Sequence, residues 1–324
     1  MSCHHTLFNI FINDMLESVR SLNNGIRVGN HSFNILAYAD DVTLYSSTIP
    51  GLQTSIDACV EYSKLWRFCF NPHKSKCMTI GPKLLSDPPS LYLDSEPMLM
   101  YNKLDILGVT FTSDNTCNNH VSHRINKCRQ SYYGLENIGL SYPGLNTEVK
   151  THLWKTICNP VLTYGLDSVS VSRGRLSELE STQGTMVKRF LGIGKRSHHT
   201  PLLRALNIPR ISDSIICKTL SLFCRSFKVD SPLLLLNARL LAEYIVSGRR
   251  YTGSAIDRIV GYGFSPAEIA FSDSSTFNHA LAGATHCGVG DGMVDSLKYL
   301  VFHENFIKPW ADEHVLAVLL TRCF

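Results

Sequence analysis

The sequence lacks several features that would set it apart from ordinary globular proteins. Its 324 residues include 11 cysteines and 13 histidines, but no Cys-x-x-Cys pair and no Cys/His group at zinc-site spacing. No apolar run reaches the about 18 residues that a membrane-spanning helix needs. Asn9, Asn13 and Asp14 interrupt the first apolar stretch, so no signal peptide is expected. These absences predict an intracellular protein, in cytoplasm or nucleus, with reduced thiols and no membrane partner.

Charge is distributed unevenly along the chain, although the net formal charge is only +4. Residues 120–228 carry 16 basic and 6 acidic side chains, whereas residues 1–119 carry 8 and 11 and residues 229–324 carry 7 and 10. An excess of positive charge in one block is typical of a surface that binds a polyanion. It also fits a solvated helical surface with ordinary lysines and arginines. Both interpretations of the basic block stay open at the level of sequence.

Hydrophobic periodicity predicts a mixture of helices and strands. Helical spacing is expected over residues 6–19, from about 46–50 to 70–72, and over 121–135, 148–162, 176–191 and 211–229. Strands are expected at 26–28, 33–38, 42–45, 76–80 and 104–111, with Thr6 as the first helix's N-cap and Gly108 as a bulge in the last strand. Residues from about 231 onward are expected to be helical and acidic.

Two adjacent carboxylates stand between two apolar, strand-like segments, in the run Tyr38-Ala39-Asp40-Asp41. Neighbouring Asp side chains repel each other, so a fold seldom places them together for stability. A divalent cation would reverse that balance, because hard cations prefer carboxylate oxygen ligands. A second interpretation is that Asp40 and Asp41 are simply polar residues of a turn.

This acidic run and several other segments, taken in order, resemble the reverse transcriptase of non-LTR (LINE-type) retrotransposons. The segments are Thr6–Leu16, Ala37–Asp41, Gly51–Gln53 with Trp66, Asn71–Lys76, Leu107–Phe111, His120–Leu135, Asn159–Gly165 and Leu191–Ile193. Their order and spacing agree from residue 6 to about residue 210. The resemblance implies an α+β fold with three regions. They are a truncated polymerase palm (an antiparallel sheet with helices) over residues 1–112, a basic helical thumb-like region over 113–230, and a helical region of unknown role over 231–324.

The resemblance also implies a chemistry, the RNA-directed synthesis of DNA with two Mg²⁺ or Mn²⁺ ions. Asp40 and Asp41 would be catalytic metal ligands, with Asp40 bridging the ions. Lys74 would approach the departing phosphate, with Lys76 as the alternative and a plain solvated lysine as the ordinary interpretation. Tyr38 would pack under the nucleotide or the primer end. The implied partners are an RNA template, a DNA primer and deoxynucleotide triphosphates.

One departure from the family pattern limits what activity we expect. In this family the fingers, a glycine loop and the strand with the other essential aspartate precede the first helix, where this chain has Met1–His5. Asp14 matches a different family position, so the partner aspartate is not assigned. We therefore expect no polymerase activity from this chain alone, and cation binding only if the missing aspartate is supplied. The alternatives are a non-catalytic RNA- or DNA-binding remnant that uses residues 120–228, or an unselected relic.

The basic block supplies the candidates for contact with nucleic acid. Binding of this kind releases counterions and weakens steeply with salt. Tyr132, Tyr133 and Trp154 fit either base stacking or an ordinary core, because aromatics at helical spacing are usually buried. The candidate phosphate contacts are Arg124, Lys127, Arg129, Lys150, Lys155, Lys188, Arg189, Lys195 and Arg196.

Overall fold

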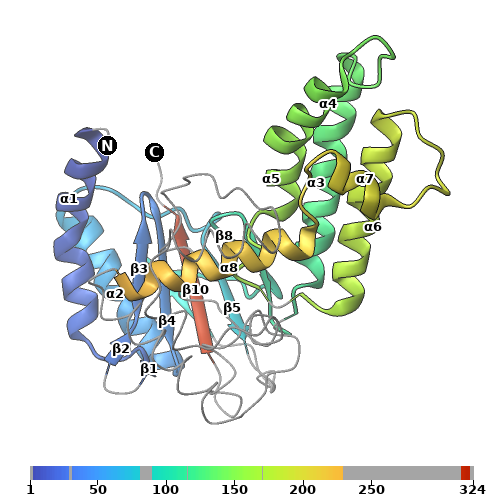
Figure 1. Cartoon of the computed structure of the whole chain (residues 1–324). Coiled ribbons are helices and arrows are strands. Elements are labelled where there is room, and N and C mark those ends of the chain that lie inside the picture. The colour runs from blue at the N-terminus through green and yellow to red at the C-terminus, as the bar shows by residue number, and fades with distance from the viewer. Residues whose placement is uncertain are drawn as a thin grey trace. The chain divides into compact units, whose positions relative to one another are not determined.

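The structure is a computed structural model of the whole chain (Figure 1). It describes residues 3–28, 31–80, 90–114, 116–169, 171–228 and 315–321. The chain divides into two compact units, one made of Met1–Thr116 with Trp310–Phe324 and one of Cys117–Pro309. Helices and small antiparallel sheets together make the fold α+β, so the predicted fold class is confirmed at that level.

The first unit combines two helices with four antiparallel sheets among its described residues. The helices are α1 (Cys3–Ser21) and α2 (Ile49–Leu65). The strands are β1 (Ile26–Val28), β2 (His31–Phe33), β3 (Ile35–Tyr38), β4 (Asp41–Ser46), β5 (Lys76–Ile80), β6 (Tyr92–Leu93), β7 (Glu96–Pro97), β8 (Lys103–Ile106), β9 (Val109–Thr112) and β10 (Val315–Thr321).

The main sheet has the strand order β3-β4-β10-β5, and every neighbouring pair is antiparallel (Figure 1). Strand β10 comes from the far end of the sequence and lies in the interior of the sheet. Our expectation that residues beyond 231 are helical is therefore wrong for 315–321. The run Val-Leu-Ala-Val-Leu-Leu-Thr is a short continuous apolar segment, which suits a strand that pairs along both edges. The rest of the expectation concerns residues outside the described ranges.

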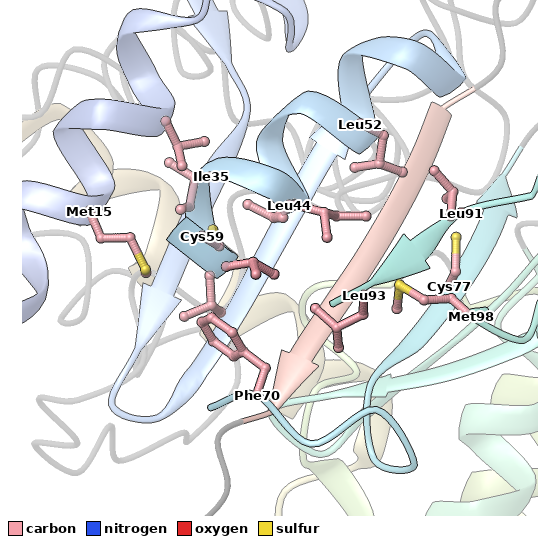
Figure 2. Packing of buried hydrophobic residues seen from close by; sticks show 14 of the residues in the cluster. Met15, Ile35, Leu44, Leu52, Cys59, Phe70, Cys77, Leu91, Leu93 and Met98 are labelled. Atoms are coloured by element: carbon pink, nitrogen blue, oxygen red, sulfur yellow. The ribbon is translucent and has the colours of Figure 1, made fainter. Parts of the chain in front are cut away.

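The core of the first unit lies between α1, α2 and one face of the main sheet (Figure 2). Opposite residues of a sheet present their side chains to the same face, so the register puts Val42, Leu44 and Cys77 on this inner face. Asp41 and Lys76 then belong to the other face. The cluster comprises Ile12, Met15, Val19, Ile35, Val42, Leu44, Leu52, Ile56, Cys59, Val60, Phe70, Cys77, Leu91, Leu93 and Met98.

The strand predicted over residues 33–38 is broken into β2 and β3, which belong to different sheets. The break falls at Asn34, whose buried side-chain amide donates to the carbonyl of Val19 and, at 3.2 Å, to Oδ1 of Asn24. These bonds tie the chain to the end of α1 instead of continuing one ladder. Beyond the break, Ile35 is buried but Tyr38 is exposed, so burial on both faces up to Asp40 was a wrong expectation.

The segment predicted as one strand over 104–111 is a hairpin, β8 and β9. Leu107 and Gly108 form its turn, with φ of +50° and +78°. Two positive φ values in a two-residue loop match a type I′ turn, for which glycine is favoured. Gly108 therefore closes a hairpin and is not a bulge.

The two helices of the first unit confirm the predicted periodicity but not every boundary. Helix α1 includes Thr6, which is therefore not its N-cap. Helix α2 begins after Thr48, whose side chain accepts a hydrogen bond from the backbone N–H of Gly51. It ends at Leu65, several residues before the predicted stop.

The second unit is helical in its described residues. The four predicted helices are present, and α7 was not predicted. A π-helical turn, Trp154–Cys158, immediately precedes the segment that contains Pro160, where the missing backbone N–H makes a regular α-helical bond impossible. The elements are α3 (Asn118–Asn137), α4 (Thr147–Leu153), α5 (Asn159–Thr163), α6 (Arg173–Phe190), α7 (His199–Ala205) and α8 (Ile211–Lys228).

Over the ranges that the structure describes, no helix has the length and apolar character needed to cross a membrane. The functional division at 112/113 and 230/231 stays a prediction.

Candidate active site

Asp40 and Asp41 lie at the tip of the hairpin formed by β3 and β4. Tyr38 and Asp41 are Cα partners, so Ala39 and Asp40 form the connecting turn. Ala39 has a φ of +50°, a left-handed conformation that costs a non-glycine residue about 1–2 kcal/mol. The paired strands hold the turn in this conformation and present both carboxylates at one end of the main sheet. Tyr38 is exposed beside them.

The electrostatics of this turn fit a cation. Asp41 is half-buried, and burial raises the pKa of its carboxyl group, with the charge of Asp40 raising that pKa further. Both causes disfavour the ionised form. A divalent cation at the turn would counteract both, because it supplies the ligand contacts and the positive charge that the carboxylates lack. An ordinary polar turn gives no comparable reason for keeping a half-buried charge beside another of the same sign.

Strands β4 and β5 begin at the same end of the main sheet. Each is antiparallel to β10, so they run parallel to each other, and β4 begins at Asp41 while β5 begins at Lys76. Two strand spacings, about 10 Å, separate them. Leu319 of β10 is the Cα partner of both Thr43 and Lys76, so Lys76 belongs to the same face as Thr43 and Asp41.

The two candidate lysines of this region differ in their surroundings. The Nζ of Lys76 lies 5.5 Å from the centroid of the Tyr101 ring, a cation–π contact. Lys74 is exposed, in a loop fixed by Oδ1 of Asn71, which accepts hydrogen bonds from the backbone N–H groups of His73 at 3.0 Å and of Lys74 at 3.2 Å. Of the two, the Lys74 side chain is better placed to meet an anionic group, and its catalytic role stays a prediction.

The described residues offer no further metal ligands near the turn. Across these ranges, no group of three or more His, Cys, Asp or Glu side chains is arranged to hold a metal ion. Asp14 is exposed on α1, whose buried residues Met15 and Val19 pack against the inner face of the sheet. Strand β10, which runs beside Asp41, contains no acidic residue. Asp40 and Asp41 are therefore part of a ligand set and not a complete one.

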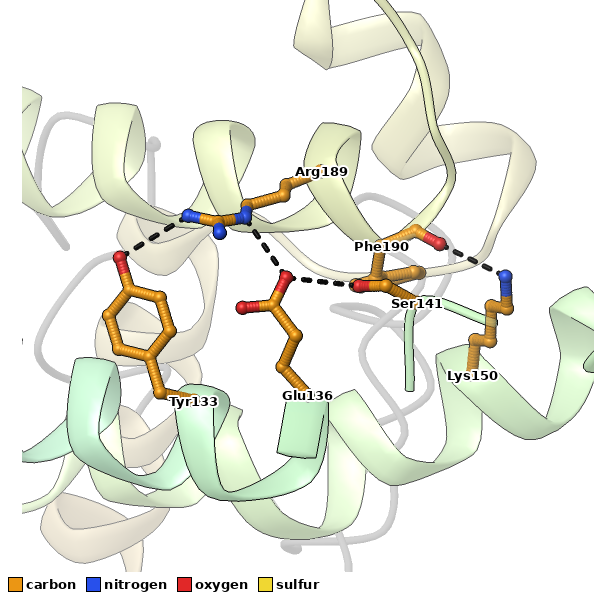
Figure 3. Close-up of polar contacts among 6 residues, drawn as sticks. All are labelled: Tyr133, Glu136, Ser141, Lys150, Arg189 and Phe190. Atoms are coloured by element: carbon orange, nitrogen blue, oxygen red, sulfur yellow. Dashed lines mark hydrogen bonds and ion pairs between the residues drawn. The ribbon is translucent and has the colours of Figure 1, made fainter. Parts of the chain in front are cut away.

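Four of the nine basic candidates in the second unit are engaged within the protein. Lys150 is buried and its Nζ donates to the carbonyl of Phe190 at 3.1 Å, which removes Lys150 from the plausible phosphate contacts (Figure 3). Arg189 forms an ion pair with Glu136 at 3.0 Å, and its guanidinium lies 5.2 Å from the centroid of the Tyr133 ring. The guanidinium of Arg124 lies 5.2 Å from the Tyr164 ring centroid, and Lys188 donates to the carbonyls of Lys195 at 2.8 Å and Ser197 at 3.3 Å.

The other five basic candidates remain suited to nucleic acid. Lys127 and Arg129 are exposed on α3, Lys195 and Arg196 are exposed in the loop that follows α6, and Lys155 is half-buried. Because Lys188 holds two carbonyls of that loop, it supports the loop rather than contacting phosphate itself. The phosphate contacts stay a prediction, now centred on the five.

The aromatic candidates separate in the same way. Tyr132 is 1% and Trp154 0% exposed, which favours the core interpretation over base stacking. The Trp154 and Phe190 ring centroids lie 6.3 Å apart. Tyr133 is 47% exposed beneath Arg189. Sequence periodicity did not separate the three, because it does not tell which side of a helix its neighbours cover.

Comparison with known proteins agrees with the acidic hairpin. Residues 5–111 match the family described as reverse transcriptase (RNA-dependent DNA polymerase). The chain is also similar to the retrovirus-related Pol polyprotein from type-2 retrotransposable element R2DM of Drosophila melanogaster, with 25% identity over 197 residues. This match covers 58% of the present chain and 18% of the relative. No solved structure matches the chain significantly.

These two matches show that the chain contains part of a reverse transcriptase. More particularly, it is reverse transcriptase sequence of a non-LTR retrotransposon, as the order of its segments predicted. The chain spans less than a fifth of the length of the curated relative, so the activity of such a whole protein is a separate matter.

Proposed function

We propose that this chain supplies the Asp40–Asp41 part of a two-metal nucleotidyl-transfer site, and that by itself it does not extend a primer. The observation that carries the proposal is the pair of carboxylates at the β3–β4 turn. One of them is half-buried with a raised pKa, and the described residues offer no third ligand. The site gains its missing ligand from a segment with a further carboxylate.

Each group at this end of the sheet then has a stated task. Mg²⁺ or Mn²⁺, when bound, activates the primer hydroxyl and stabilises the leaving pyrophosphate. Asp40 and Asp41 hold the cation through their carboxylate oxygens. Lys74 stabilises charge on the departing phosphate, and Lys76 is the alternative for that task. Tyr38, exposed beside Asp41, supports the nucleotide or the primer end.

The partners of this function are an RNA template, a DNA primer and deoxynucleotide triphosphates. The resemblance of residues 5–111 to reverse transcriptases supports them. In unit two, the exposed Lys127, Arg129, Lys195 and Arg196 would bind phosphates of the template and primer. Residues 113–230 would then act as a thumb and residues 1–112 as a partial palm.

A second candidate function is binding of RNA or DNA without catalysis. The observation that favours it is the excess of 16 basic over 6 acidic side chains in residues 120–228. This function needs no metal, so it does not depend on the completeness of the site at Asp40 and Asp41.

The decisive test combines cation binding with primer extension. The purified chain is titrated with Mn²⁺ and free Mn²⁺ is measured by electron paramagnetic resonance, for wild type, Asp40→Asn and Asp41→Asn. We expect weak Mn²⁺ binding by wild type that either substitution lowers at least tenfold, and no extension of a DNA primer on an RNA template. Extension that Asp40→Asn abolishes would overturn the claim of an incomplete site. Binding that neither substitution changes would overturn the assignment of the ligands.

A further inference from the structure

Strands β4 and β5 are shaped for the interior of a sheet, yet they do not pair with each other. Residues 42–46 of β4 and residues 77–80 of β5 are all buried. Continuous burial is typical of strands with neighbours on both sides, whereas an edge strand normally alternates with polar residues. The gap between the two strands is one strand wide, and residues 315–321 fill it (Figure 2).

Hydrogen bonds elsewhere show which backbone groups face this gap. The N–H of Tyr45 donates to the carbonyl of Asn34 at 2.9 Å, so alternate residues of β4, including Leu44, direct their backbone groups to the other edge. On β5, the carbonyl of Cys77 accepts from the N–H of Tyr101 at 2.8 Å and therefore points away from the gap. Val318 is the Cα partner of both Leu44 and Cys77. Its backbone bonds consequently run to Leu44, and the pair with Cys77 is the non-hydrogen-bonded kind.

We propose that the sheet of the first unit contains a strand-acceptor site between β4 and β5, and that its occupant is residues 315–321 of the same chain. This segment has no charge, no proline and no glycine, and three of its residues are β-branched, as a central strand requires. Thr321 is the Cα partner of Asp41, so the last residue of β10 lies beside the acidic turn.

The proposal goes beyond nucleotidyl transfer and does not depend on it. It makes the C-terminal segment a structural part of the acidic hairpin. Without β10, β4 keeps β3 as its partner but loses its other edge, and β5 leaves the main sheet. The relative position of Asp41 and Lys76 across the sheet is then set by residues that are distant in sequence.

Engineered cross-linking in the full chain tests the register directly. A non-hydrogen-bonded antiparallel pair has Cα atoms about 4.5 Å apart, within the range of about 4.4–6.8 Å that a disulfide bridges. Val318→Cys should therefore form a disulfide with the native Cys77 under mild oxidation, identified by mass spectrometry of the proteolysed protein. Leu319→Cys is the matched control, because its Cα partner on β5 is Lys76. Equal linkage of both variants to Cys77, or none of Val318→Cys, would contradict the proposal.

Hydrogen exchange then tests the acceptor site. Proline at the centre of a strand removes a ladder donor, whereas proline at the first residue of a strand is tolerated. In Val318→Pro we expect amide exchange in residues 42–46 and 76–80 to rise at least tenfold, and in Val315→Pro to change little. A synthetic peptide of residues 312–324 should restore slow exchange to Val318→Pro, while the same peptide carrying that proline should not.

Unchanged exchange in Val318→Pro, or no response to the wild-type peptide, would show that no acceptor site exists. If Val318→Pro unfolds the unit altogether, the cross-link in Val318→Cys still decides. Neither readout involves a metal or catalysis, so a failure of this proposal is distinguishable from a failure of the proposed active site.

Discussion

At the scale of single residues, the functional information is concentrated in Asp40 and Asp41. The sequence predicted their place between two strands, and the β3–β4 register confirms it. It did not predict how the lysines nearby differ, with Lys76 stacked on Tyr101 and Lys74 exposed. A contact with an aromatic ring 25 residues further along the chain leaves no local pattern that sequence analysis would detect.

The raised pKa of Asp41 predicts a dependence of stability on pH. The folded protein binds the Asp41 proton more tightly than the unfolded chain does, so this group's stabilising contribution is present at acid pH and is lost as pH rises from the ordinary carboxyl range through the raised pKa. Asp41→Asn should therefore raise the melting temperature at pH 7 and have little effect near pH 3. Thermal unfolding followed by circular dichroism at both pH values measures the difference.

Asp40→Asn is the internal comparison for this experiment. Burial is the larger cause of the Asp41 pKa shift and the charge of Asp40 the smaller, so Asp40→Asn should raise the melting temperature at pH 7 by less than Asp41→Asn does. A lower melting temperature for Asp41→Asn at pH 7 would contradict the electrostatic account of the turn.

At the scale of elements, sequence periodicity located most helices and the strands β1, β4 and β5. It failed where a polar or glycine residue redirects the chain. Asn34 breaks a predicted strand through its bonds to Val19 and Asn24, and Gly108 turns another into a hairpin. In both cases the apolar pattern continues across the break, so the pattern alone predicts one strand.

The turn at Gly25 offers a test of the same region. A Cβ added to Gly25 would collide with the backbone carbonyl of Phe33, whereas one added to Gly134 on α3 meets nothing within 4 Å. Gly25→Ala should lower the free energy of unfolding by about 1–3 kcal/mol, as overpacking does. Gly134→Ala should raise it by about 0.5–1 kcal/mol, because glycine is unfavourable within a helix. Urea titration of both variants gives the values, and equal effects would refute the predicted close approach.

At the scale of the whole molecule, charge is separated from the acidic turn. The basic block lies within the second unit and Asp40 and Asp41 within the first. Sequence analysis counted nine candidate phosphate contacts, and the structure leaves five of them suited to that task. The others bind carbonyls, a carboxylate or aromatic rings, and one-dimensional charge counts do not register such partners.

Binding to nucleic acid should depend on salt through the exposed basic residues. Each phosphate contact to a single strand contributes about 0.7 to the slope of log K against log salt. Replacing Lys195 and Arg196 together by alanine should therefore reduce the slope for single-stranded RNA by about 1.4. Fluorescence anisotropy over a salt series measures it. Lys103→Ala, an exposed lysine of β8 in the first unit, is the control and should leave the slope unchanged. A wild-type slope near zero would dismiss the nucleic-acid function of the basic block.

The sequence by itself determined the reverse transcriptase relationship, the α+β class, the acidic hairpin and the basic helical block, because these depend on short motifs and on periodicities that neighbouring residues create. Tertiary structure alone decided that residues 315–321 form the interior strand beside Asp41, which lysines are engaged, and which aromatic rings are buried. Those outcomes depend on pairing and packing between residues far apart in the chain. An apolar run such as Val315–Thr321 fits a helix or a strand until the edges of β4 and β5 select the strand.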